Sequence, residues 1–145
     1  MDVELMDSIR LFSKKKNAIK ELDVERSRDL LGFFSEVFVS DSGRRWWWEA
    51  LRCDAKTIEY GDDDGLEIIK KILTGVDSVF FVVTDDEFPP WSVFKGRLDD
   101  VLELISEQRY FEYFLFREGM DWCVFDTHHN SLVVAGVLNQ NLDFA

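Results

Sequence analysis

The sequence predicts an α+β fold in which an antiparallel-rich sheet of about five to six strands carries N-terminal and intervening helices packed on it. Three observations lead to this prediction. Helical periodicity dominates the first half of the chain, apolar strand-like runs begin near residue 76, and the last three of these runs follow one another with short connections. The chain has 145 residues, no internal repeat and no linker rich in Pro, Gly or Ser, so residues 1–145 are expected to form a single domain.

Residues 1–45 are predicted to be helical. Leu5, Ile9 and Phe12 follow one another at spacings of four and three residues, which predicts a first helix over about residues 3–20. A second, more strongly amphipathic helix is predicted from apolar residues at positions i, i+3, i+4, i+7 and i+8, namely Leu30, Phe33, Phe34, Val37 and Phe38.

Two shorter helices are expected before the strands. Asp41 or Ser42 can cap a helix that carries the three tryptophans at residues 46–48. The acidic residues 62–64 place negative charge where a helix N-terminus favours it, so another helix is predicted directly after them. The residues of this helix that are expected to face inward are Leu66, Ile69 and Leu73.

Strands and one further helix are predicted from residue 76 onward. Residues 78–84 are apolar on both alternating faces, which is typical of a central strand covered on both sides. A second strand is expected at residues 91–95, after a break that contains two prolines, and a helix with apolar residues between Leu98 and Ile105 follows it. Three consecutive strands are then expected to form an antiparallel meander, at residues 110–117, 122–126 and 132–138.

The net charge of −12 is unevenly distributed along the chain. Residues 1–45 carry nine acidic and nine basic groups, whereas residues 46–145, the acidic and strand-rich part, carry twenty acidic and eight basic groups. A negative field repels nucleic-acid phosphates and anionic lipid headgroups, and it speeds the encounter with a basic partner. We therefore expect a basic protein partner, and we expect neither nucleic acid nor a membrane.

The location of the protein is predicted from its apolar segments. No apolar run approaches the ~20 residues that cross a bilayer. Met1 leads directly into acidic residues rather than into the charged and then apolar segments of a secretion signal. These features predict a cytoplasmic protein.

Two short segments are candidates for binding a partner. Trp46, Trp47 and Trp48 would fan over about 200° of a helix, at about 100° per residue, so at least one ring is expected to be partly exposed. Tryptophan is enriched at the energetic centres of interfaces, which makes the exposed ring a candidate anchor. The acidic residues of the loop after the strand at 78–84 are further candidates, because their charge suits a basic partner: Asp85, Asp86 and Glu87.

His128 and His129 are the two histidines of the chain. Adjacent residues of an extended segment point to opposite faces, so one metal ion rarely takes both of them. They can belong to a structural turn in which Asp126, Thr127 or Asn130 bonds turn amides, or they can contact a partner at the surface. No nucleophile elbow, phosphate loop or metal-ligand spacing accompanies them, so we expect no catalytic residues, no metal and no cofactor.

Three motifs of the C-terminal half resemble a group of small bacterial proteins. They are the segment at 111–114 (FEYF), the segment at 121–125 (DWCVF) and the turn at 128–130 (HHN), which follow the group's pattern of an E-Y-Y segment, a D-W-L-like strand and an E-N-H-H-D-like turn. The segment at 47–51, the strand at 79–83 and Trp91 also fit. Members of the group are similar to immunity proteins found beside secreted toxins. Here Asp126 and Thr127 stand where the group has a Glu-Asn pair.

Three hypotheses about function follow. The first, which the charge distribution and the resemblance favour, is a non-enzymatic protein-binding module, a bacterial immunity or inhibitor protein that neutralises a basic effector. The second is an intracellular adaptor or structural protein, such as a homodimer formed through the tryptophan segment. The third is a metal-dependent enzyme that uses His128 or His129.

Overall fold

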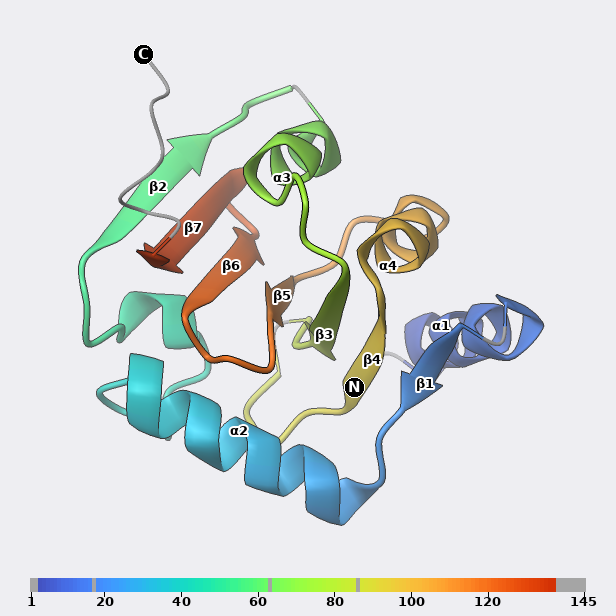
Figure 1. Ribbon diagram of the computed structural model, residues 1–145, viewed down its shortest axis with the longest axis horizontal. Helices are drawn as coiled ribbons and strands as arrows, with labels where there is room; N and C mark the ends of the chain where they lie inside the picture. The colour runs from blue at the N-terminus through green and yellow to red at the C-terminus, as the bar shows by residue number, and fades with distance from the viewer. Residues whose placement is uncertain (1–2, 17, 63, 86, 138–145) are drawn as a thin grey trace.

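The computed structural model describes residues 3–16, 18–62, 64–85 and 87–137. One antiparallel sheet of seven strands forms its centre, with helices on both faces (Figure 1). Its order across the sheet is β1-β4-β3-β5-β6-β7-β2. The strands are β1 (Ile19–Glu21), β2 (Ala55–Glu59), β3 (Ser78–Val83), β4 (Val93–Arg97), β5 (Tyr113–Phe116), β6 (Trp122–Thr127) and β7 (Ser131–Gly136). The predicted α+β class is confirmed, with slightly more strands than expected.

Four helices and one short turn of 3₁₀ helix cover the sheet. They are α1 (Val3–Lys16), α2 (Val24–Phe38), the 3₁₀ turn η1 (Trp47–Glu49), α3 (Gly65–Ile72) and α4 (Leu98–Ser106). Helices α1, α3 and α4 pack on one face, and α2 with η1 packs on the other. No helix in the described part of the chain is long and apolar enough to span a membrane.

The alternation of strand side chains divides the core into two parts. In β3, Val79, Phe81 and Val83 point toward α1, α3 and α4, whereas Phe80 and Val82 point toward α2. All four residues of β5 and all six of β6 are buried, because both faces of these strands are covered. The predicted strand at 78–84 is confirmed as β3, inside the sheet, and the predicted meander is confirmed as β5-β6-β7.

Phe34 is the centre of the core beneath α2. Its side chain is fully buried, and its ring lies 4.9 Å from that of Phe114 and 4.8 Å from that of Phe116. The Trp47 ring is stacked with the Phe34 ring, with 5.9 Å between the ring centres and an angle of 8° between the ring planes. Aromatic pairs at such separations stabilise a core beyond the apolar area they bury. One residue of α2 therefore joins the helix, the sheet and η1.

The buried stripe of α2 differs from the predicted one. The buried residues are Ser27, Leu31, Phe34 and Phe38, spaced by four, three and four. Phe33 and Val37 are 64% and 47% exposed. The sequence offers two overlapping apolar stripes on this helix, and contact with the sheet selects the one that includes Leu31.

Two predicted helical segments differ in the structure. Helix α1 ends at Lys16 rather than near residue 20, and β1 follows and pairs with β4, so the first 45 residues include a strand. The helix expected around residues 46–48 is only the turn η1, because the Asp41 side chain accepts from the Gly43 amide and caps no helix. In contrast, α3 begins as predicted, with Asp64 accepting from the Leu66 amide.

Strand β2 had no counterpart in the prediction. Its burial alternates between exposed and half-buried residues, and it pairs with β7 at the edge of the sheet, from Ala55 opposite Ala135 to Glu59 opposite Ser131. Because three of its five residues are polar, hydrophobic periodicity does not reveal it.

The two phenylalanines of α2 provide a test of this packing. Replacing the buried Phe34 by Ala is expected to lower the free energy of unfolding by roughly 3–5 kcal/mol, through lost burial and the cavity left behind. Replacing the adjacent, exposed Phe33 by Ala is expected to change it by less than about 0.5 kcal/mol. Urea unfolding of both variants gives the comparison, and equal losses would contradict the orientation of α2.

Candidate functional site

The candidate site lies at the end of the sheet where β5 begins, β6 ends and β7 begins. Of the six buried polar or charged residues of the described chain, four gather there: Glu112, Asp126, Thr127 and Ser131. The strand register places Tyr113 opposite Asp126 and Thr127 opposite Ser131. Buried polar groups are costly unless they are hydrogen-bonded, so the bonds among these residues determine the local structure.

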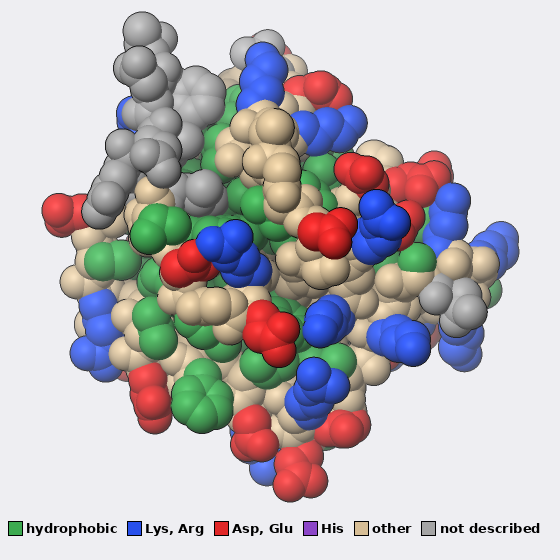
Figure 2. Space-filling view, viewed as in Figure 1, with side chains coloured by type: hydrophobic (Ala, Val, Ile, Leu, Met, Phe, Trp, Pro, Cys, Tyr) green, Lys and Arg blue, Asp and Glu red, His purple; other side chains and the backbone are tan. Residues whose placement is uncertain are grey.

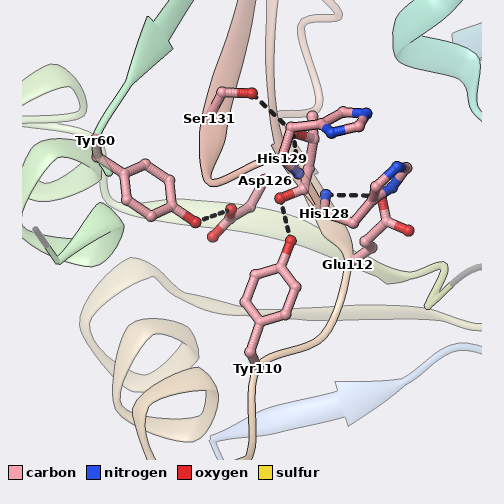
Figure 3. A network of polar contacts seen from close by, with 8 residues as sticks. Tyr60, Tyr110, Glu112, Asp126, His128, His129 and Ser131 are labelled. Carbon is pink, nitrogen blue, oxygen red and sulfur yellow. Dashed lines mark hydrogen bonds and ion pairs between the residues drawn. The ribbon is translucent and has the colours of Figure 1, made fainter. Parts of the chain in front are cut away.

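Asp126 is buried between two tyrosines. The residue is 6% exposed. Its carboxylate oxygens accept one hydrogen bond from the Tyr60 hydroxyl at 2.7 Å and one from the Tyr113 hydroxyl at 2.9 Å. Tyr60 reaches it from the end of β2 (Figure 3). Gly65, the first residue of α3, allows this approach, because a Cβ atom there would lie 3.0 Å from the Tyr60 ring.

Burial raises the pKa of Asp126 from 3.8 to about 6. The hydrogen bonds from Tyr60 and Tyr113 lower this pKa, while the nearby carboxylates of Glu112 and Asp64 raise it further. Burial also raises the pKa of both tyrosine hydroxyls well above 10, so they remain protonated donors. The Asp126 carboxyl group therefore titrates at about pH 6, higher than an ordinary aspartate.

A pocket of about 360 Å³ opens beside Asp126, between α3, α4 and the end of the sheet. Its polar lining includes Tyr60, Tyr110, Asn130 and Arg109 in addition to Asp126. The Arg109 guanidinium donates to the Asp85 carboxylate at 2.9 Å and to the Tyr110 carbonyl at 2.7 Å. Pockets of this size with converging polar groups are typical of ligand sites.

The turn between β6 and β7 is fixed by hydrogen bonds. The Tyr110 hydroxyl donates to the Thr127 carbonyl, the Thr127 and Ser131 hydroxyls lie 2.8 Å apart, and the His129 amide donates to the Thr127 hydroxyl at 3.2 Å (Figure 3). Asn130 adopts the left-handed conformation with φ of 53°, which asparagine tolerates better than most residues. Thus Thr127 bonds a turn amide as expected, whereas Asp126 bonds tyrosines instead.

Two tryptophans and two histidines pack together beside this turn, and we call Trp46, Trp48, His128 and His129 the aromatic–histidine patch. The His128 ring lies 4.9 Å from that of Trp46 and 5.8 Å from that of Trp48. The rings of Trp46 and Trp48 are stacked at 6.2 Å, and the two imidazoles are 4.0 Å apart. Trp46 and Trp48 are half-buried, whereas Trp47 is 4% exposed and belongs to the core. Four of the predicted partner-binding residues therefore meet in space.

Glu112 holds one side of the patch in place. It is 4% exposed, and one of its carboxylate oxygens accepts from the His128 amide at 3.2 Å and lies 3.0 Å from His128 Nδ1. On the other side, the Arg45 guanidinium lies 5.6 Å from the Trp46 ring centre and 4.6 Å from that of Phe88, within the range of cation–π attraction. The patch is thus held on two sides by charged groups.

The predicted acidic loop lies near this end of the sheet. The Asp85 amide donates to the Glu112 carbonyl at 3.0 Å, and the Asp85 carboxylate pairs with Arg109. The Glu87 carbonyl accepts from the Trp91 indole at 3.0 Å. Asp86 lies outside the described residues. Asp85 therefore supports the site through hydrogen bonds and an ion pair.

Sequence reasoning did not single out Asp126 with its tyrosines, or Glu112, as site residues. A signal existed for Glu112, an acidic residue between two aromatic residues, and a weaker one for Asp126, which directly follows the apolar run at 122–125. In the described part of the chain no three His, Cys, Asp or Glu residues are grouped so that they could hold a metal ion. The site thus consists of a patch on the α2 side of the sheet and a carboxylate pocket on the α3 and α4 side.

Comparison with protein families matches residues 3–143 to a family of unknown function, DUF6756. No curated protein and no solved structure matches the chain significantly.

The raised pKa of Asp126 predicts how stability depends on pH. The folded protein holds this proton up to about pH 6, whereas the unfolded chain releases it near 3.8, so stability from this group is present below pH 3.8 and lost as pH rises through 6. The expected loss is on the order of 3 kcal/mol. As pH is raised from 4 to 7.5, the free energy of unfolding of Asp126→Asn should therefore increase relative to that of the wild type. Urea unfolding of both proteins at the two pH values measures this change.

Asp121 provides a control of opposite sign. Its ion pair with Arg117 lowers the pKa of its carboxylate, so its contribution is present above pH 3.8 and is lost as pH falls. Asp121→Asn should lose stability relative to the wild type near neutral pH and recover toward it in acid. Parallel pH curves for the two variants would contradict the assigned environment of Asp126.

Removing the Tyr113 hydroxyl tests the hydrogen bond to Asp126 directly. Tyr113→Phe is expected to lower the free energy of unfolding at pH 7.5 by roughly 1.5–3 kcal/mol, because a buried carboxylate loses one of its two donors. The same change should raise the pKa of Asp126 above about 6. Carbon-13 NMR titration of the Asp126 carboxyl measures the pKa, and an unchanged value would exclude the bond.

Proposed function

The chain belongs to DUF6756, a family of unknown function, and we propose that it is a non-enzymatic protein-binding module that binds a basic protein through the aromatic–histidine patch. The observation that carries the proposal is the meeting of Trp46 and Trp48 with His128 and His129 at the surface, from segments far apart in the chain. Tryptophan is enriched at the energetic centres of protein interfaces, and both rings keep part of their surface accessible to a partner.

The tryptophans at residues 46–48 support this proposal because only one of them is needed for the core. Trp47 packs into the core against Phe34 and Trp91, so the folding role of the segment is met by one ring. Trp46 and Trp48 pack instead against the turn that carries the histidines. In addition, the Trp46 indole N–H is buried without a hydrogen-bond partner in the described structure. Burying an unmet donor costs about 1–3 kcal/mol, which a small ring movement toward a partner's acceptor would recover.

Hydrogen bonds fix the backbone of the patch before any partner arrives. The segment that carries it is closed by an antiparallel bridge between Val39 and Leu51, and the Ser40 amide donates to the Ala50 carbonyl at 2.7 Å. On the histidine side, Glu112 and Thr127 bond the amides of His128 and His129. A surface that is ordered in advance loses less side-chain entropy on binding.

The net charge supports a basic partner mainly through long-range attraction. In the view of Figure 2, acidic and basic side chains are interspersed over the surface, with hydrophobic side chains between them. The charge of −12 therefore does not form one unbroken acidic field on this face. Such a charge raises the association rate of a basic protein, while the aromatic contacts supply most of the binding energy.

Two finer versions of this function differ in the partner. In the first, which the resemblance to immunity proteins favours, the partner is a basic effector that the protein neutralises. In the second, the protein is an intracellular adaptor that pairs with another copy of itself through the exposed rings, among which Phe88 is 57% exposed. Sedimentation analysis separates them, because the second requires a dimer when the protein is alone in solution.

The test combines partner capture with a matched pair of aromatic variants. The wild type is used to capture proteins from its native cell extract and to bind the product of the adjacent gene at low and moderate salt. Trp48→Ala is expected to weaken binding at least about tenfold, whereas Phe33→Ala, which removes an exposed ring from α2, leaves it unchanged. Affinity should fall with salt. Equal binding by both variants would overturn the proposal.

A further inference from the structure

We propose that the pocket beside Asp126 is a binding site for a small organic cation, whose ammonium or guanidinium group is held by the Asp126 carboxylate and the surrounding tyrosine rings. The pocket is separate from the aromatic–histidine patch. Tyr60, Tyr113 and the pocket belong to the face of the sheet covered by α3 and α4, whereas the patch lies on the α2 side. The proposal therefore goes beyond partner binding and does not depend on it.

The buried charge of Asp126 has no cationic partner among the described residues. In the structure described for this chain, no Lys, Arg or His pairs with its carboxylate, whose donors are the neutral hydroxyls of Tyr60 and Tyr113. The charged groups that act on it most, Glu112 and Asp64, are both acidic. Buried carboxylates are normally paired or coordinated, so a cation that enters this pocket would complete an arrangement that the chain leaves incomplete.

The Asp126 carboxylate also retains acceptor capacity beside the pocket. An ionised carboxylate has about four lone-pair sites, and the two tyrosines use one on each oxygen. Asp126 is among the residues that line the pocket. An ammonium or guanidinium group is a donor without acceptors, which suits the remaining sites.

Aromatic side chains line much of the pocket. The pocket walls include Tyr60, Tyr110, Phe111 and Tyr113, and the 48% exposure of Tyr110 places this ring at the opening. Cations are attracted to aromatic ring faces, and the attraction increases when both partners are withdrawn from water. A carboxylate beneath several aromatic rings is the combination that recognises organic cations rather than bare metal ions, which prefer several oxygen ligands.

Arg109 does not serve as the missing cation. It lines the same pocket, yet its guanidinium is bound to the Asp85 carboxylate at 2.9 Å and to the Tyr110 carbonyl at 2.7 Å. An anionic ligand held by Arg109 would lie close to Asp126 and Asp64, which also line the pocket. The surplus of acidic groups therefore favours a cationic ligand.

The experiment uses simple probes on the whole protein. Choline, n-butylamine and methylguanidine are titrated at pH 7.5 in 150 mM salt, with binding followed by amide shifts of Tyr110 and Asn130 in nitrogen-15 NMR spectra. The uncharged analogue 3,3-dimethyl-1-butanol, which has the shape of choline without its charge, is the matched ligand control. We expect at least one cation to bind with millimolar affinity or tighter, and the alcohol not to bind.

Two further measurements make the result decisive. Asp126→Asn should weaken the binding of that cation at least about tenfold, while Phe33→Ala on the far side of the molecule leaves it unchanged. In the wild type, binding should weaken as pH falls below 6, because a protonated Asp126 no longer carries the charge. Absence of binding by all three cations, equal binding of the alcohol, or full binding by Asp126→Asn would each overturn the proposal.

Discussion

The sheet is buried on both faces, and this constraint determines where its polar groups lie. Strands β5 and β6 have no exposed residue, so neither can carry an unpaired polar side chain in its middle. The two buried charged residues of these segments are found at one end, where Glu112 precedes β5 and Asp126 lies next to the last residue of β6. Groups from other segments converge there to supply hydrogen bonds, with the Tyr60 hydroxyl donating to Asp126 and the His128 amide donating to Glu112.

This convergence connects the two candidate surfaces. Glu112 accepts from His128 on the α2 side and raises the pKa of Asp126 on the other side. Thr127 lies between them, with its carbonyl bonded by Tyr110 and its hydroxyl by the His129 amide. One short turn therefore positions both the aromatic–histidine patch and the carboxylate pocket. A partner that moves the turn would alter the environment of Asp126 through contacts that are already present.

The sequence predicted those parts of the fold that depend on long apolar patterns. Strand β3, the meander and α4 have periodicities that survive tertiary packing. The pattern could not reveal β1 and β2, because one is only three residues long and the other is a polar edge strand. Nor could it choose between the two stripes of α2, since Leu31 and Phe33 are both apolar and only the sheet distinguishes them.

The candidate site was also predicted only in part, because some of its residues are conspicuous in the sequence and others are not. Tryptophan triplets and paired histidines are conspicuous in a sequence, and the fold brings Trp46, Trp48, His128 and His129 together. The tyrosines around Asp126 are not conspicuous, because Tyr60 and Tyr113 are ordinary aromatic residues until a strand pairing places them beside a carboxylate. Their role depends on long-range register, which periodicity does not specify.

The order of the strands also has a consequence for how the protein folds. Among the five inner strands, β3 to β7, the pairings of β3 with β4, β5 with β6 and β6 with β7 join neighbouring segments of the chain, whereas β3 and β5 pair across β4 and α4. The edge strand β2 instead pairs across most of the domain, with Ala55 opposite Ala135. Contacts between segments so distant in sequence carry a large loop-closure entropy cost, so we expect them to form late in folding. Because Tyr60 follows β2, its bond to Asp126 depends on this long-range pairing, and the carboxylate pocket is complete only when β2 is in place.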